Sequence, residues 1–358
     1  MSVVLSICGD PGGAAAVAPV ISMLSDRLEV HALCYRQARD VFQRYQIPMS
    51  ELIENSEAVS RSVKSCSPDF LLLGTSVNGG DWELDALMAA TGVPSLSVLD
   101  FWSNYTARFT HRSGVVCLPD RIAVMDEQAR QEMAAEGFPV DRLIVTGQPA
   151  FDELAKKKAF CCNASLAQLN CDQTLSAREI RVAFVSQPIL ARCEKRECSK
   201  HTVLPELVDA LEKISRSTKN RISLVIRPHP REYDDDFAWV QSEQISVSID
   251  RCADPRVLLV ECDLVAGMES ALLLEACALG CVVASIQLNS GPHDCLPTNR
   301  MGLSLRISRE KDLEPMIHSL LFDHLHRKNL LRKCCGWKLE EDATKNIVDL
   351  ILGTLKTR

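Results

Sequence analysis

Apolar runs of strand length alternate along this chain with amphipathic stretches of helix length, and this alternation constrains the fold more than any other feature. It is the pattern of parallel βαβ units, in which helices cover both faces of a sheet. Residues 1–152 are therefore expected to form one doubly wound domain. Its predicted strands are Val3–Cys8, Val30–Tyr35, Phe70–Thr75, Ser95–Asp100, Arg121–Met125 and Leu143–Thr146.

A second series of the same kind predicts a second α/β domain over residues 180–335. Residues 153–179 break the pattern and are expected to connect the domains, and Gly336 separates a last helix in residues 336–358. Tandem α/β domains leave a cleft, and the carboxyl ends of parallel strands bind ligands there. The second series consists of strands Ile180–Ser186, Ser223–Ile226, Ser246–Ile249, Leu264–Ala266 and Val282–Gln287, with helices around Leu204–Ser215 and Ala271–Leu279.

Composition excludes several classes of protein. The chain has 358 residues, 46% hydrophobic and 24% charged, which is ordinary for a globular protein of two domains. Its net charge is −7 and it has no basic stripe interleaved with aromatics, so nucleic acid is not an expected partner. Val3–Cys8 is too short for a signal peptide, and no apolar run approaches the ~20 residues of a membrane span. We expect a cytoplasmic protein whose membrane contact, if it has any, is peripheral.

The 16 cysteines are scattered through predicted strands and helices, where a thiol behaves as a small hydrophobic group. One group invites a metal interpretation, but it contains no Cys-x-x-Cys and its spacing is poor for zinc or an iron–sulfur cluster. We therefore predict no metal. The group consists of Cys161, Cys162, Cys171, Cys193, Cys198 and His201.

The segment Gly9-Asp10-Pro11-Gly12-Gly13 lies where the first strand turns into the first helix. Glycines there permit close backbone approach, and a helix N-terminus offers N–H groups to an anion or a sugar hydroxyl. The segment is neither Gly-x-Gly-x-x-Gly nor a P-loop, which argues against a dinucleotide or ATP cradle. A tight turn without a ligand is the alternative.

A stiff loop, Arg227-Pro228-His229-Pro230-Arg231-Glu232, follows the predicted strand Ser223–Ile226. Prolines on both sides of His229 restrict its backbone. Arginine suits bidentate phosphate binding, and a rigid histidine binds a phosphate oxygen or transfers a proton. A histidine held by its own turn, without a ligand, is the alternative.

The segment Gly267-Met268-Glu269-Ser270-Ala271 follows a predicted strand and opens a helix. Ser270 is a candidate cap, and the first N–H groups of the helix are expected to point into the same cleft as His229. Together these two loops predict a phosphate site that includes Arg227, Glu269 and Ala271. Glu275 faces either a ribose or solvent, and a plain helix cap is the alternative for the whole segment.

Aromatic and polar side chains gather after the predicted strand Ser95–Asp100, in the run Leu99 to Tyr105. Aromatic rings with polar tips suit sugar faces. Asp100, Asp10 and His111 are all candidates for a general base that deprotonates a hydroxyl. Packing of Phe101 and Trp102 in the core is the alternative.

Four segments, in this order and spacing, resemble the GT-B superfamily of nucleotide-sugar glycosyltransferases and 2-epimerases over nearly the whole chain. The resemblance implies two Rossmann-like domains facing across a cleft, with the acceptor on the first domain, the nucleotide sugar on the second, and a C-terminal helix crossing back. It implies an acceptor side at Gly12, Gly13, Trp102, Asn104 and Tyr105. The segments are Gly9–Gly13, Pro119–Met125 with Val145–Asp152, Arg227–Glu232 and Gly267–Gly280.

Within the superfamily, His229-Pro230 is similar to the His-Pro motif of bacterial sialyl-, Kdo- and polyol-phosphate transferases, whose histidine contacts the donor phosphate. Retaining enzymes of the glycogen-synthase type carry a glutamate where this chain has Gly267, so the resemblance favours an inverting reaction. Non-hydrolysing UDP-N-acetylglucosamine 2-epimerases carry Ser-Gly-Gly near the helix start, where this chain has Glu269-Ser270-Ala271.

These features predict a metal-independent glycosyltransferase that moves a sugar from a nucleotide sugar to a glycan or lipid-linked acceptor in surface polysaccharide or glycoconjugate synthesis. No cofactor is expected beyond the nucleotide sugar as substrate. Asp10 or Asp100 is the expected base, and Arg227, His229 and the N–H groups after Ser270 stabilise the leaving phosphate. A UDP-sugar 2-epimerase is the first alternative, and a non-catalytic sugar-nucleotide-binding protein is the second.

Overall fold

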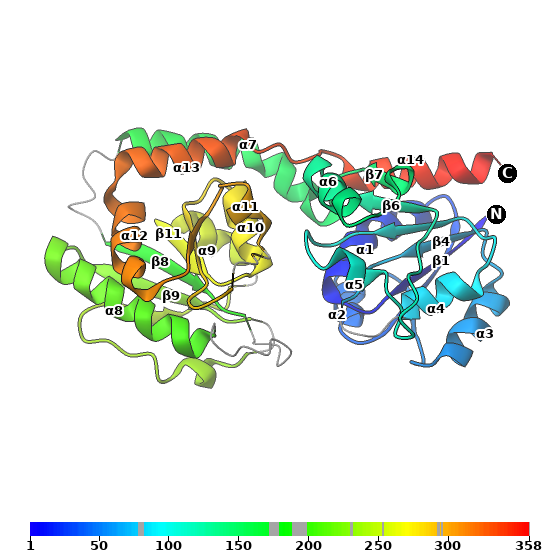
Figure 1. Cartoon of the computed structure of the whole chain (residues 1–358), viewed down its shortest axis with the longest axis horizontal. Helices are drawn as coiled ribbons and strands as arrows, with labels where there is room; N and C mark the ends of the chain where they lie inside the picture. The colour runs from blue at the N-terminus through cyan, green and yellow to red at the C-terminus, as the bar shows by residue number, and fades with distance from the viewer. Residues whose placement is uncertain are drawn as a thin grey trace. The chain divides into compact units, whose positions relative to one another are not determined.

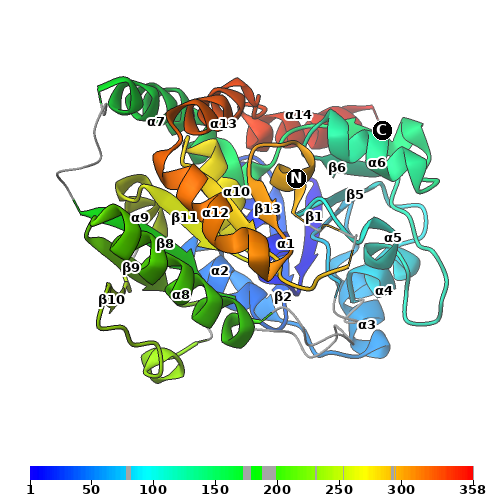
Figure 2. The same ribbon diagram turned by 60° about the vertical axis from the view of Figure 1, so that its left-hand side comes forward.

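The computed structural model describes residues 1–77, 82–171, 179–187, 199–229, 232–252, 254–291, 294 and 296–357, and the side chains of α7 up to residue 167. The chain divides into two compact units (Figures 1 and 2). The first unit contains Met1–Ala155 and Leu339–Arg358, and the second contains Lys156–Lys338.

The first unit is built on a seven-stranded parallel sheet in the order β3-β2-β1-β4-β5-β6-β7. This order reverses direction beside β1, as in a doubly wound sheet. Its strands are β1 (Val3–Cys8), β2 (Glu29–Cys34), β3 (Met49–Glu51), β4 (Phe70–Leu73), β5 (Ser95–Val98), β6 (Arg121–Val124) and β7 (Leu143–Val145). Its helices are α1 (Pro11–Ser25), α2 (Ala38–Arg44), α3 (Ser56–Cys66), α4 (Trp82–Ala89), α5 (Tyr105–Arg108), α6 (Glu127–Ala135) and α14 (Ala343–Lys356), with 3-10 turns η1 (Val140–Arg142) and η2 (Pro149–Phe151).

Alternate residues of the central strands face two different cores. On β1, Val4 packs with α1, α2 and α14, whereas Leu5 and Ile7 pack with α3 and α4. Because both faces are covered, β4 and β5 are buried at every position. This explains why these strands are continuous apolar or small-residue runs in the sequence rather than alternating ones.

The second unit repeats the plan with six parallel strands in the order β10-β9-β8-β11-β12-β13. Its strands are β8 (Ile180–Val185), β9 (Ile222–Arg227), β10 (Ser246–Ile249), β11 (Leu264–Gly267), β12 (Val283–Ile286) and β13 (Leu305–Ile307). Its helices are α8 (Lys200–Thr218), η4 (Asp234–Phe237), α9 (Pro255–Glu261), α10 (Ala271–Ala278), α11 (Pro297–Arg300), α12 (Glu310–Phe322) and α13 (His324–Gly336).

The predicted fold class, α/β with two Rossmann-like parallel sheets, is confirmed. The short strands β3 and β13 were not predicted, because a three-residue strand carries too little periodic signal. The expected connection contains most of a long helix, α7 (Asp152–Cys171), which begins in the first unit and continues into the second. Figures 1 and 2 show α13 alongside α7, where Lys158 Nζ donates to the Cys334 carbonyl at 2.5 Å.

The last helix, α14, packs on α1 within the first unit. Its first N–H groups are capped by Asp152 at the start of α7, which accepts from Ala343 at 2.8 Å and from Thr344 at 3.0 Å. No helix in the described part of the chain is long and apolar enough to cross a membrane.

Candidate functional site

The turn between β1 and α1 is packed tightly against its own unit. A Cβ on Gly9 would lie 2.1 Å from the Tyr35 ring, and one on Gly13 would lie 2.6 Å from the Thr75 carbonyl oxygen. Gly9 and Gly13 thus allow close contact with other residues of the same unit, and a ligand at this turn stays a prediction. Asp10 is the N-cap residue of α1, but its side chain makes no capping hydrogen bond, and its Oδ2 accepts from the Val77 N–H at 3.3 Å.

Asp100, directly after β5, is held against the start of α1. Its Oδ1 accepts a 2.6 Å hydrogen bond from Thr75 Oγ1 and pairs with the guanidinium of Arg108 on α5, whose side chain is 4% exposed. Its Oδ2 lies 2.2 Å from where a Cβ on Gly12 would be. Two of the sequence-predicted residues, Gly12 and Asp100, thus meet at the carboxyl end of the sheet.

Glu83 on α4 is a functional candidate that the sequence did not single out. It is 4% exposed, its Oε1 accepts from the Gly9 N–H at 2.9 Å, and its Oε2 accepts from the Tyr35 hydroxyl. Burial, with a smaller contribution from the charge of Asp10, raises the pKa of the Glu83 carboxyl to about 8. In the sequence, Glu83 was recognisable only as an acidic residue in the first turn of an otherwise apolar helix face, and this is weak evidence for a functional role.

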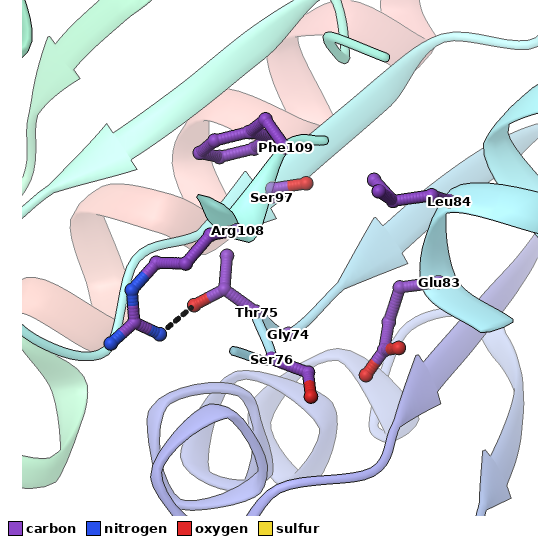
Figure 3. A pocket seen from close by; sticks show the side chains of 8 residues that line it. All are labelled: Gly74, Thr75, Ser76, Glu83, Leu84, Ser97, Arg108 and Phe109. Atoms are coloured by element: carbon purple, nitrogen blue, oxygen red, sulfur yellow. Dashed lines mark hydrogen bonds between the residues drawn. The ribbon is translucent and has the colours of Figure 1, made fainter. Parts of the chain in front are cut away.

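Glu83 lines a small cavity of about 10 Å³, room for about one water molecule. Figure 3 shows Arg108 donating to Thr75 on one side of this cavity and the Glu83 carboxylate near Ser76 on the other. The Ser76 hydroxyl is buried and has no hydrogen-bond partner in the described part of the chain. The cavity is too small for a sugar.

The aromatic residues after β5 belong to the core, which corrects their expected place on the acceptor side. Trp102 is 2% exposed, donates its indole N–H to Asp126 at 2.9 Å and stacks on Phe151. Tyr105 is equally buried and donates to Glu132 at 2.6 Å. Asn104, in the left-handed region at φ 56°, is exposed, and its acceptor role stays a prediction.

His111, the third candidate base, is buried. Its Nδ1 lies 2.7 Å from Ser113 Oγ, and its Nε2 lies 3.6 Å from Asp85 Oδ2. Asp85 also pairs with Arg112 at 2.7 Å. His111 Nε2 is buried and has no hydrogen-bond partner among the described residues, so a role for His111 as a base stays a prediction.

In the second unit, three loops leave the carboxyl ends of the adjacent strands β9, β8 and β11. Arg227 ends β9, and its guanidinium donates to Asp250 Oδ2 at 2.7 Å and to the Cys252 carbonyl at 2.6 Å. His229 is half-buried. Pro230 and Arg231 of the same loop lie outside the described residues. Because neighbouring parallel strands end at one edge, the described residues that follow these three strands lie at the same edge of the sheet.

Glu232, 5% exposed, joins two of these loops. Its Oε2 accepts from the His229 N–H at 2.8 Å, and its Oε1 accepts from Ser186 Oγ at 3.1 Å and from Lys200 Nζ at 3.0 Å. Glu232 is the last residue of the segment Arg227–Glu232, but no role was predicted for it from the sequence. The sequence feature that could have identified it is the spacing, because a carboxylate three residues after His229 can accept a hydrogen bond from the His229 N–H.

Ser270 caps α10 as predicted: its side chain accepts from the Leu272 N–H at 3.3 Å. The Glu269 N–H donates to Gln187 Oε1 at 3.0 Å, which ties this loop to the one after β8. Glu275 pairs with Arg256 at 2.8 Å and its side chain is 16% exposed, so it does not face open solvent, and a contact with a ribose stays a prediction. Ala271 is exposed at the start of the helix.

The cysteine-rich group is spread over several environments. Cys161 and Cys162 lie on α7, where Cys162 is buried against the Ala278 carbonyl, and His201 packs at a tilt against Trp239 with ring centroids 5.4 Å apart. Cys193, Cys198 and the side chain of Cys171 lie outside the described part of the structure. Within that part, no three His, Cys, Asp or Glu residues are grouped so that they would hold a metal ion.

No family model and no curated protein matches this sequence. Solved structures do match. UDP-GlcNAc 2-epimerase from Neisseria meningitidis bound to UDP-GlcNAc aligns with a TM-score of 0.64 and 14% identity, over 99% of this chain and 100% of its own. S. aureus MnaA with UDP aligns with a TM-score of 0.69 and 14% identity, over 100% and 98% of the two chains.

Anabaena Alr3699/HepE in complex with UDP and glucose aligns with a TM-score of 0.60 and 15% identity, over all of both chains. At these identities the likeness concerns the fold. The chain has the GT-B type of architecture, with two Rossmann-like domains.

Proposed function

We propose that this protein is an enzyme that binds a UDP-sugar and inverts its configuration at C2, by eliminating UDP and adding it back. The observation that carries the proposal is the likeness over the whole chain to UDP-GlcNAc 2-epimerases, including one bound to UDP-GlcNAc. The glycosyltransferase predicted from the sequence becomes the second candidate.

The reaction needs stabilisation of a leaving diphosphate, and the second unit offers suitable donors. The loop of Arg227 and His229 follows β9 and the start of α10 at Ser270 follows β11, and these two strands lie on either side of β8. A helix N-terminus and cationic side chains stabilise the negative charge that develops on the leaving group. In this proposal His229 binds the diphosphate, and the N–H groups after Ser270 bind it beside His229.

The reaction also needs a carboxylate that removes the proton at C2, and Asp10 fits this role better than Asp100. Asp100 is engaged by Arg108 and Thr75 and packs on Gly12. Among the described residues, Asp10 accepts one hydrogen bond, from the Val77 N–H at 3.3 Å, although it occupies a capping position where aspartate normally binds the helix N–H groups. In this proposal Asp10 is the base and Asp100 fixes the α1 N-terminus beside it.

The test is incubation with UDP-GlcNAc in D2O, without any acceptor, followed by proton NMR. An epimerase produces the C2 epimer and loses the C2 proton signal of both sugars. Asp10→Asn should abolish this exchange, whereas the matched exposed substitution Asp40→Asn should leave it unchanged. His229→Ala should slow it by about 10²–10³, by analogy with loss of an oxyanion-hole donor.

Glycosyl transfer is favoured by one observation, the similarity of the His229 loop to the His-Pro motif of transferases. A transferase leaves UDP-GlcNAc unchanged when no acceptor is present and consumes it when one is added. Tight UDP binding without turnover in either experiment would instead favour the non-catalytic alternative.

A further inference from the structure

The contacts of Glu232 are unusual because a single buried carboxylate receives three donors from three different elements. They are the Ser186 hydroxyl after β8, the ammonium of Lys200 at the start of α8 and the backbone N–H of His229 after β9. We call this set the Glu232 bridge. The Glu232 and Lys200 side chains are 4% and 11% exposed, so water competes little for these hydrogen bonds.

The bridge fixes the backbone of His229 rather than its ring. Pro228 is buried before it, and the N–H of Glu232 donates back to the His229 carbonyl at 2.9 Å. The Lys200 ammonium also lies 4.4 Å from the centroid of the Phe237 ring, so a cation–π contact holds it in addition to the Glu232 carboxylate. The turn that presents His229 is therefore attached to β8 and α8 by one side chain.

The next residue along the β8 loop extends the connection. Gln187, directly after Ser186, accepts from the Glu269 N–H at the start of the α10 segment. The His229 turn and the Ser270 cap are thus linked through one polar chain that runs across the ends of β9, β8 and β11. A site that must hold a diphosphate benefits when its donors are fixed before the ligand arrives, because less ordering accompanies binding.

We infer that Glu232 is a positioning residue that holds the His229 backbone in place for the diphosphate of the nucleotide sugar, an inference that rests on the proposed function. Glu232 does not touch the ligand in this view. It acts through His229, and its buried partner Lys200 keeps its charge compensated.

Two double variants distinguish a role of Glu232 in positioning the His229 backbone from a role in packing alone. Glu232→Gln with Lys200→Met removes both charges but keeps an amide oxygen that accepts from His229. Glu232→Leu with Lys200→Met removes the charges and the acceptor at similar volume. We expect the first to bind UDP within about threefold of the wild-type Kd and the second to bind at least about tenfold more weakly, as measured by calorimetry. Glu261→Gln, an exposed carboxylate on α9, is the control and should bind UDP normally.

Amide hydrogen exchange of the peptide that contains His229 measures how firmly its backbone N–H is held when no ligand is present. Exchange should be slow in the wild type and the Gln/Met variant and fast in the Leu/Met variant. Equal UDP affinity and equal exchange in the two double variants would overturn the inference. If the Leu/Met protein does not fold, Ser186→Ala tests the same bridge, and a wild-type Kd and exchange rate there would overturn it.

The two proposals fail in different ways. A wild-type protein that does not bind UDP contradicts the proposed function, whatever the exchange data show. Normal UDP binding together with unaltered His229 exchange in the Leu/Met variant contradicts the role of Glu232 and leaves the proposed function standing.

Discussion

The N–H of Gly9 donates a 2.9 Å hydrogen bond to Oε1 of Glu83, a residue 74 positions later in the chain. The Tyr35 hydroxyl binds the other oxygen of the same carboxyl group. Tyr35 and Glu83 therefore enclose the turn that presents Asp10. Because the carboxyl group is buried, its protonation is coupled to folding.

Glu83 should make stability fall as pH rises. The pKa of Glu83 is about 8 in the folded state, against 4.5 ordinarily, so between about pH 5 and pH 8 the folded protein holds a proton that the unfolded chain releases. The free energy of unfolding should therefore decrease across this window, by on the order of a few kcal/mol. Urea unfolding at several pH values measures it.

The control for this prediction is Glu83→Gln, which cannot ionise. The difference in unfolding free energy between wild type and variant should shift in favour of the variant from pH 5 to pH 8. A difference that is constant with pH would contradict the assignment of the proton to Glu83.

Asp100→Asn should destabilise the first unit by about 3 kcal/mol, because it leaves the buried guanidinium of Arg108 without its carboxylate. Chemical denaturation measures the loss. Glu57→Gln breaks the exposed pair with Arg61 on α3 and should cost less than about 0.5 kcal/mol. Similar losses in the two variants would show that the Asp100 pair is solvated.

Gly12→Ala should cost about 1–3 kcal/mol, because the new methyl group would overlap the Asp100 carboxylate. In an Asp100→Ala background this cost should disappear, since the clash is gone and alanine favours helix. A double-mutant cycle measures the coupling, and additive effects would contradict it. Gly353→Ala on α14, where a Cβ meets nothing within 4 Å, is the control and should be neutral or stabilising.

Asp152→Ala should cost about 1 kcal/mol by removing the cap of α14. Asp152→Asn, which keeps one acceptor oxygen, should cost less. Asp342→Asn should have little effect, since the Asp342 side chain makes no capping hydrogen bond although it occupies the N-cap position. Thermal unfolding compares the three, and the reverse order of losses would assign the cap to Asp342.

The sequence by itself determined the elements and their class. Runs such as Phe70–Leu73 are apolar at every position because helices cover both faces of the sheet. Such runs therefore predict parallel strands. Ser270 could be predicted as a cap from the sequence because capping depends only on residues within one helical turn. Gly336 likewise ends α13 where a break was expected.

Only the tertiary structure decided which side chains meet. Strand order places β1 between β2 and β4, and this brings Glu83 to Gly9 and Asp100 to Gly12. Trp102 is also buried, although its place among aromatic and polar residues after a predicted strand had suggested a sugar-binding surface. Periodicity and capping act over a few residues, whereas these contacts depend on how distant strand ends are ordered in the sheet, and no local pattern encodes that order.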